Sequence, residues 1–181
     1  TMPNKTPTKR TARMTTTGTK RRATIEKRQR AVTLVTGGTG ALGQQLVAWL
    51  AAHGARHITV VARRQQVLVV PGAEVRVVAA DITDVTAMAQ ILEGIDRPLK
   101  GVFHLAGVAA LPVCQADPRE AYDVNVAGTG AVLEAARRAG VRRVVFSSTS
   151  AVYERTKSTP LREDAEIAPD LVYACTKHSA E

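Results

Sequence analysis

TGGTGALG, at residues 36–43, is the most informative stretch of this sequence. It follows a short β-rich apolar run (31–36) and precedes a stretch whose apolar residues have helical spacing (44–54). A strand, a glycine-rich turn and a helix are therefore predicted in that order, and Gly54 is expected to end the helix. The helix face predicted to be buried carries Leu42, Leu46, Trp49 and Leu50.

The glycine spacing predicts a phosphate-binding turn. Gly38, Gly40 and Gly43 satisfy GxGxxG, in which glycines allow a tight turn and a close approach of the backbone to a pyrophosphate. The N-terminus of the following helix offers free N–H groups to the same anion. With a strand before it and a helix after it, the motif indicates dinucleotide binding. The residues predicted to line the phosphates are Gly37, Gly38, Thr39, Gly40, Ala41, Leu42 and Gly43.

The alternation of strands and helices continues along the chain. Further strands are predicted at 57–62, 74–79, 101–107 and 142–149, and helices at 84–95, around 119–140 and at the C-terminal end. The strands are apolar on both faces and show neither the period of two nor the hairpin turns of an antiparallel sheet. The fold class predicted for residues 31–181 is therefore α/β, a doubly wound parallel sheet of Rossmann type. The 84–95 helix is expected to bury Ala87, Ile91 and Leu92.

The positive charge of the chain lies in its first thirty residues. Residues 1–30 carry ten Lys or Arg against one acid, Glu26, which accounts for the formal net charge of +9. The same segment holds nine threonines and few large apolar residues, so we expect a disordered basic tail. Nucleic-acid binding is expected only through this tail, and the folded part is neutral. A transit peptide in residues 1–30 is the alternative interpretation of this composition.

Composition otherwise favours a cytoplasmic globular protein. No apolar run is long enough to span a membrane. The two cysteines, Cys114 and Cys175, lie far apart without metal-ligand spacing, so neither a disulfide framework nor a metal site is indicated.

The residues after the second predicted strand bear on the choice of nucleotide. An acid at this position binds the ribose 2′-hydroxyl of NAD, whereas a base accommodates the 2′-phosphate of NADP. Arg63 and Arg64 occupy the position, so NADP(H) is favoured over NAD(H). Asp81, after the third strand, is expected either to cap the next helix or to bind an adenine amine. His104 is expected to be buried in the core as part of its strand, and Trp49 as part of its helix.

Six motifs in order extend this interpretation. TGGTGALG, ADITD, FHLAG, DVNVAGTGAVLEAA, VVFSSTSAVY and YACTK have the order and spacing of the extended short-chain dehydrogenases/reductases, or NAD-dependent epimerase/dehydratases, which residues 31–181 resemble. The resemblance implies that Tyr173 and Lys177 are catalytic, that Thr149 or its neighbour Ser148 binds the reacting oxygen, and that Asn125 belongs to the same site. It also implies cofactor contacts from Ile82, Leu105, Ala106, Gly107, Asn125, Tyr173 and Lys177.

The spacing of the tyrosine and the lysine is chemically suited to proton transfer. Four residues apart, Tyr173 and Lys177 share one helix face. Lowering the pKa of a phenol from about 10 to about 7 requires roughly 4 kcal/mol. One cation about 4 Å away supplies energy of that order at an effective dielectric constant near 20. The tyrosine can then exchange a proton with an alcohol or a carbonyl while hydride moves to or from nicotinamide.

The resemblance implies an NAD(P)-dependent oxidoreductase, epimerase or dehydratase with a small-molecule substrate: a nucleotide sugar, ketone, aldehyde or alcohol. Two alternatives stay open: a polyketide-type ketoreductase, which residues 31–108 resemble equally, and a non-catalytic NADP(H)-binding module. A homodimer is compatible with either enzyme. Glu154 stands where the extended branch usually has glycine. Because the sequence stops within the helix of Tyr173, we expect an N-terminal fragment, inactive alone, without its sixth strand and substrate-binding segment.

Overall fold

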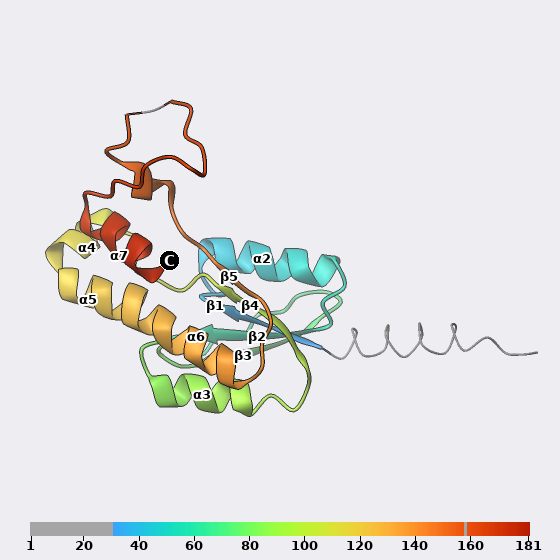
Figure 1. Cartoon of the computed structure of the whole chain (residues 1–181). Coiled ribbons are helices and arrows are strands. Elements are labelled where there is room, and N and C mark those ends of the chain that lie inside the picture. The colour runs from blue at the N-terminus through green and yellow to red at the C-terminus, as the bar shows by residue number, and fades with distance from the viewer. Residues whose placement is uncertain (1–30, 158) are drawn as a thin grey trace, which may run out of the picture.

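The computed structural model describes residues 31–157 and 159–181, and its centre is a five-stranded parallel sheet (Figure 1). The strand order is β3-β2-β1-β4-β5, and every neighbouring pair is parallel. The predicted fold class is therefore confirmed. The predicted basic tail lies outside the described residues. The strands are β1 (Val32–Thr36), β2 (His57–Ala62), β3 (Glu74–Ala79), β4 (Leu99–His104) and β5 (Val144–Phe146).

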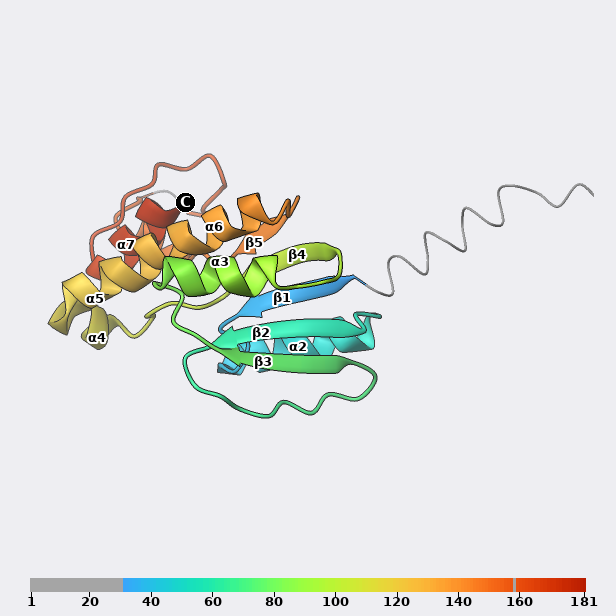
Figure 2. The same ribbon diagram turned by 90° about the horizontal axis from the view of Figure 1, so that it is seen from below.

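Helices cover both faces of this sheet (Figure 2). α2 (Ala41–Ala52) packs on one face, where Val47 and Leu50 join the apolar side chains of β1 and β2. α3 (Val85–Glu93) and α6 (Gly128–Arg138) pack on the other face, with Met88 and Val132 in the core there. Two separate apolar cores, one on each side of the central strands, are what a doubly wound fold requires.

α2 has a different rotation from the one its apolar spacing predicts. Leu42 and Trp49 are 63% and 55% exposed, so their predicted burial is wrong. The buried face carries Gly43, Val47, Leu50 and Ala51. Gly43 packs against the glycine turn, and this contact fixes which face of the helix meets the sheet. The helix does end as expected, since Ala52 is its last residue and Gly54 has a φ of +88°.

α3 also departs in detail from the prediction. Met88 and Leu92 are buried, whereas Ala87 and Ile91 are only partly buried. The helix is capped by Asp84, whose side chain accepts a hydrogen bond from the N–H of Ala87 at 2.9 Å. Asp81 is not the cap.

The long helix predicted around 119–140 is interrupted. α5 (Pro118–Tyr122) leads into a π-helical turn, η1 (Asp123–Ala127), which continues as α6. A π turn places one extra residue in the helix and is frequent at functional sites. Here it contains Asn125, one of the residues that the sequence singles out.

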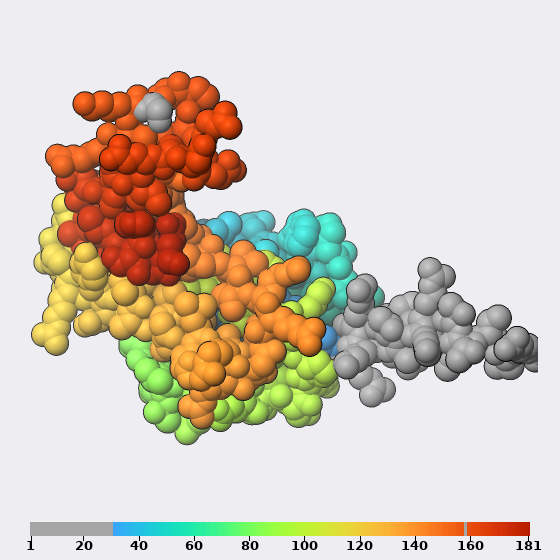
Figure 3. All heavy atoms as spheres, viewed as in Figure 1, coloured from blue at the N-terminus to red at the C-terminus, as the bar shows by residue number. Residues whose placement is uncertain are grey.

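The remaining elements gather beyond the carboxyl ends of the strands. α4 (Leu111–Ala116), the 3₁₀ turn η2 (Ser150–Tyr153) and α7 (Val172–Ala180) lie together there (Figure 1). The loop between η2 and α7 projects from this end of the molecule as a separate lobe (Figure 3). None of the helices in the described ranges is long and apolar enough to cross a membrane.

Candidate functional site

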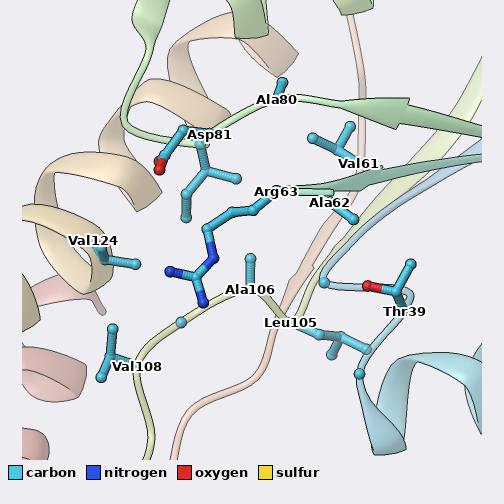
Figure 4. A pocket seen from close by; sticks show the side chains of 14 residues that line it. Thr39, Val61, Ala62, Arg63, Ala80, Asp81, Leu105, Ala106, Val108 and Val124 are labelled. Atoms are coloured by element: carbon cyan, nitrogen blue, oxygen red, sulfur yellow. The ribbon is translucent and has the colours of Figure 1, made fainter. Parts of the chain in front are cut away.

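A cleft of about 260 Å³ opens at the carboxyl ends of β1, β2, β3 and β4. The order of the strands reverses between β1 and β4, because β2 and β3 lie on one side of β1 whereas β4 and β5 lie on the other. Open α/β sheets bind their ligands at such a switch point. Side chains from several strand ends point into this cleft (Figure 4). Its lining comprises Gly37, Thr39, Gly40, Val61, Ala62, Arg63, Ala80, Asp81, Ile82, Leu105, Ala106, Gly107, Val108 and Val124.

The glycine turn forms one wall of the cleft and has no room for a side chain at Gly37 or Gly43. Gly37 has a φ of +70°, and a Cβ there would lie 2.7 Å from the backbone nitrogen of Ala106. A Cβ on Gly43 would lie 2.2 Å from the carbonyl oxygen of Gly37. Gly40 is the N-cap of α2 and provides no side-chain cap, so the first N–H groups of the helix lack side-chain partners. This combination suits a bound pyrophosphate.

Arg63 is the charged side chain that extends into the middle of the cleft (Figure 4). It follows β2 directly, at the position that the sequence assigns to the nucleotide ribose. Arg64 is exposed and does not line the cleft. Asp81 lines it from the far side, and its Oδ1 accepts hydrogen bonds from the N–H and the hydroxyl of Thr83 at 2.9 and 2.8 Å.

A buried chain of hydrogen bonds runs from β1 to η1. The Oγ1 of Thr36 lies 2.6 Å from Nδ1 of His104, and Nε2 of His104 lies 2.9 Å from Oγ1 of Thr129. Thr129 donates to the carbonyl oxygen of Asn125 at 2.6 Å. All four residues are at most 2% exposed, so these polar groups depend on one another for hydrogen bonds. The chain joins the strand before the glycine turn to the turn that contains Asn125.

The hydrogen-bond pattern assigns the protons along this chain. Because the hydroxyl proton of Thr129 goes to a carbonyl, Nε2 of His104 must carry a proton and donate it to Thr129. Nδ1 is then the acceptor for Thr36, whose oxygen accepts in turn from the N–H of Ala106 at 3.3 Å. Burial, with a smaller effect of Lys177, lowers the pKa of His104 to about 4. The imidazole is therefore neutral in the folded protein.

Asn125 connects this chain to α7. Its side-chain amide pairs with the backbone of Val108, accepting from the N–H at 2.8 Å and donating to the carbonyl at 2.9 Å. The same amide nitrogen donates to Oγ1 of Thr176 at 3.0 Å. Thr176 donates to the carbonyl oxygen of Tyr173 at 2.8 Å. Asn125 thus contacts the segment after β4 that lines the cleft and the helix that carries Tyr173.

Lys177 is buried to an extent that is unusual for a lysine. Lys177 is only 6% exposed, and its Nζ lies 4.0 Å above the centre of the Phe146 ring. Burial lowers the pKa of Lys177 to about 8, and the carboxylate of Glu181 opposes that shift. The ammonium form predominates at pH 7, and the aromatic face stabilises it.

The other candidate catalytic residues lie on the two segments that flank the projecting loop. Tyr173 is half-buried in the first turn of α7. Thr149 is the N-cap of η2, and its Oγ1 accepts from the N–H of Ala151 at 3.1 Å. Ser148 is exposed and donates to the carboxylate of Glu181. Because η2 and α7 pack together, the structure brings the two segments to the same region.

The sequence-predicted site residues divide into two groups. Those that line the cleft are Gly37, Thr39, Gly40, Arg63, Asp81, Ile82, Leu105, Ala106 and Gly107. Those outside its lining are Gly38, Ala41, Leu42, Gly43, Arg64, Asn125, Ser148, Thr149, Tyr173 and Lys177. Sequence reasoning missed the apolar lining at Val61, Ala62, Ala80, Val108 and Val124, and it missed Phe146 beneath Lys177. Val61 and Ala62 could have been predicted to line the cleft, because they lie at the end of a predicted strand. No sequence signal, apart from its place in a predicted strand, indicated that Phe146 lies beneath Lys177.

Comparison with known proteins identifies a matching family and several related enzymes. The family model described as "NAD dependent epimerase/dehydratase family" matches residues 33–181. UDP-glucose 4-epimerase of Azospirillum brasilense is 34% identical over 152 residues, which are 82% of this chain and 42% of that protein. Sterol demethylase protein B of Methylococcus capsulatus is 39% identical over 117 residues, 65% of this chain and 34% of that protein.

A solved structure has the same architecture. The enzyme WbmG of Bordetella bronchiseptica, crystallised in complex with NAD, superimposes with a TM-score of 0.71 at 27% identity. The match covers 82% of this chain and 47% of WbmG. The chain therefore spans less than half the length of each of these relatives.

Proposed function

The chain belongs to the NAD-dependent epimerase/dehydratase family, and on this premise we propose that the whole protein is an NAD(P)-dependent epimerase or dehydratase of a nucleotide sugar. The nucleotide-sugar assignment is supported by the similarity to UDP-glucose 4-epimerase. The similarity to a sterol demethylase protein, at comparable identity over a shorter match, makes a sterol the alternative substrate class.

The observation that carries the proposal is the cleft at the switch point of the sheet. On one wall a turn with no room for a side chain at Gly37 or Gly43 leads into α2, and a basic side chain enters the cleft from the end of β2. These features fit the pyrophosphate and the ribose of a nicotinamide dinucleotide. Such a cofactor supplies a hydride acceptor and donor. The residues proposed to hold it are the cleft-lining glycines with Arg63, Asp81 and Ala106.

The proposed proton chemistry belongs to Tyr173, Lys177 and Thr149. The hydroxyl of Tyr173 exchanges a proton with the reacting oxygen of the substrate, while the hydroxyl of Thr149 hydrogen-bonds that oxygen. We assign Lys177, which is still protonated at neutral pH, as the cation of this site. Asn125 holds α7 through Thr176, so we assign it a supporting role in this site.

The preference for NADP(H) is part of the proposal and rests on Arg63. The guanidinium lies in the cleft beyond β2, where a 2′-phosphate would need a cation. In the whole protein we expect NADPH to bind about tenfold more tightly than NADH, a difference of about 1.4 kcal/mol. Arg63→Asp should remove this difference, whereas Arg142→Asp, which changes an exposed arginine before β5, should retain it. Fluorescence titration of both nucleotides measures this, and equal or tighter NADH binding by the unmodified protein would refute the preference.

The activity itself is tested by incubation of the whole protein with NAD(P) and UDP-glucose or UDP-galactose. Chromatographic detection of the epimer or of a dehydrated 4-keto sugar supports the proposal. Cofactor binding without turnover of either sugar, together with reduction of NAD(P) by a sterol, would contradict the nucleotide-sugar assignment. Cofactor binding without turnover of any of these substrates would instead favour the non-catalytic binding module.

A further inference from the structure

One carboxylate, that of Glu154, connects the two ends of the loop between η2 and α7. Glu154 lies just after η2, and its Oε2 accepts the backbone N–H groups of Asp170 and Leu171 at 3.1 and 3.0 Å. Leu171 is the N-cap of α7 and provides no side-chain cap of its own. One oxygen therefore binds the two N–H groups that directly precede the helix of Tyr173.

Backbone pairing brackets this contact. The N–H of Ala168 donates to the carbonyl of Val152 at 2.8 Å, and the N–H of Arg155 donates to the carbonyl of Ala168 at 3.0 Å. Arg155 also lies 3.4 Å from the carboxylate of Asp170. These contacts close the base of the loop up to Ala168. Beyond it, two side chains link the chain entering α7 to the end of η2: Arg155 through the carboxylate of Asp170, and Glu154 through the two backbone N–H groups.

The position of this link matters because of what lies at each side. Thr149 caps η2 five residues before Glu154, and Tyr173 lies two residues after Leu171. The two bonds are charge-assisted, and a carboxylate at a helix N-terminus also interacts favourably with the helix dipole. A shift of the first turn of α7 would move Tyr173 relative to Thr149.

We propose that Glu154 is a positioning residue that holds the N-terminus of α7, and with it Tyr173, at a fixed place relative to Thr149. The inference rests on the proton-transfer roles given above to those two residues. It assigns a function to a side chain that is exposed and distant in sequence from the helix it orients.

The kinetic test compares three variants of the whole protein. Glu154→Ala removes both hydrogen bonds and should lower kcat at least about tenfold, because small misplacements of a catalytic group are costly. Glu154→Gln retains an amide oxygen that accepts the same two N–H groups, so it should stay within about threefold of the unmodified enzyme. Glu163→Ala removes an exposed carboxylate from the same loop and should leave kcat unchanged. NADPH affinity should be unchanged in all three. An Ala variant with the kcat of the unmodified protein, or a Gln variant as impaired as Ala, would overturn the proposal.

Amide hydrogen exchange tests the link without any substrate. The N–H groups of Asp170 and Leu171 should exchange faster in Glu154→Ala than in Glu154→Gln or Glu163→Ala. If this holds while no form turns over a nucleotide sugar, the proposed substrate is wrong and the link stands. If exchange at both amides is the same in Glu154→Ala as in the unmodified protein, the proposal fails whatever the activity.

Discussion

Thr36, the last residue of β1, is hydrogen-bonded through its Oγ1 to Nδ1 of His104, the last residue of β4, at 2.6 Å. The two residues are neighbours across the switch point of the sheet, and Ala106 at the edge of the cleft donates its N–H to the same Oγ1 of Thr36. The wall of the cleft and the turn of Asn125 are thus connected through a neutral imidazole.

The neutral imidazole predicts acid sensitivity. His104 has a pKa of about 4 when folded and about 6.5 when unfolded, so the unfolded chain binds an extra proton between these values. Stability should fall as pH drops from about 6.5 to about 4, by an amount on the order of 3 kcal/mol if the whole shift is realised. His104→Gln should be less stable at pH 7 but should lose less on acidification. Urea unfolding at pH 7 and pH 4.5 measures this, and equal acid losses in both proteins would contradict the prediction.

The Lys177 ammonium predicts an alkaline limit for activity. If the charged form assists Tyr173, kcat/KM should decline as pH rises through the Lys177 pKa of about 8. Phe146→Leu removes the aromatic face beneath the cation and should move this limb to lower pH, by up to about one unit. Phe103→Leu, which removes a ring packed near the other core, is the control and should not move it. An alkaline limb that is unchanged in Phe146→Leu would count against this role of the ring.

The glycine turn predicts a contrast between two Gly→Ala variants. In Gly43→Ala the new methyl group would meet the Gly37 carbonyl oxygen at 2.2 Å and the Gly38 Cα at 2.6 Å, so α2 must shift away from the turn. We expect cofactor affinity to weaken at least about tenfold. Gly130→Ala, in α6, meets nothing within 4 Å and should be neutral or stabilising by up to about 1 kcal/mol. Titration of nucleotide with thermal unfolding distinguishes the two, and full affinity in Gly43→Ala would show that the close approach is not needed.

The sequence predicted β2 and β3 well because their signal is local, whereas β4 (Leu99–His104) and β5 (Val144–Phe146) differ from the predicted bounds 101–107 and 142–149. The second and third strands have the predicted bounds, 57–62 and 74–79, since each is a short apolar run between turn residues. The buried face of α2 could not be predicted from spacing alone. Leu42 and Trp49 are apolar, but the contact of Gly43 with the preceding turn decides the rotation of the helix. The spacing of apolar residues carries no information on that contact.

The sequence predicted which residues belong to the candidate site, but not the hydrogen bonds that join them. The family resemblance singled out Asn125, but the π turn that contains it has no periodic signature in the sequence. His104 was expected in the strand core, and it is buried. Its partners, Thr36 and Thr129, lie 68 and 25 residues away, so only the packed sheet and helix bring them together.

The role of Tyr173 is the central claim, and turnover of the Tyr173→Phe variant of the whole protein tests it most directly. The variant loses the hydroxyl and keeps the ring, so nucleotide affinity should stay within about twofold of the unmodified protein. Turnover of the nucleotide sugar should fall by a factor of about 10² to 10⁴, the usual contribution of a positioned acid or base. Turnover within a few-fold of the unmodified enzyme, with nucleotide still bound, would contradict the account.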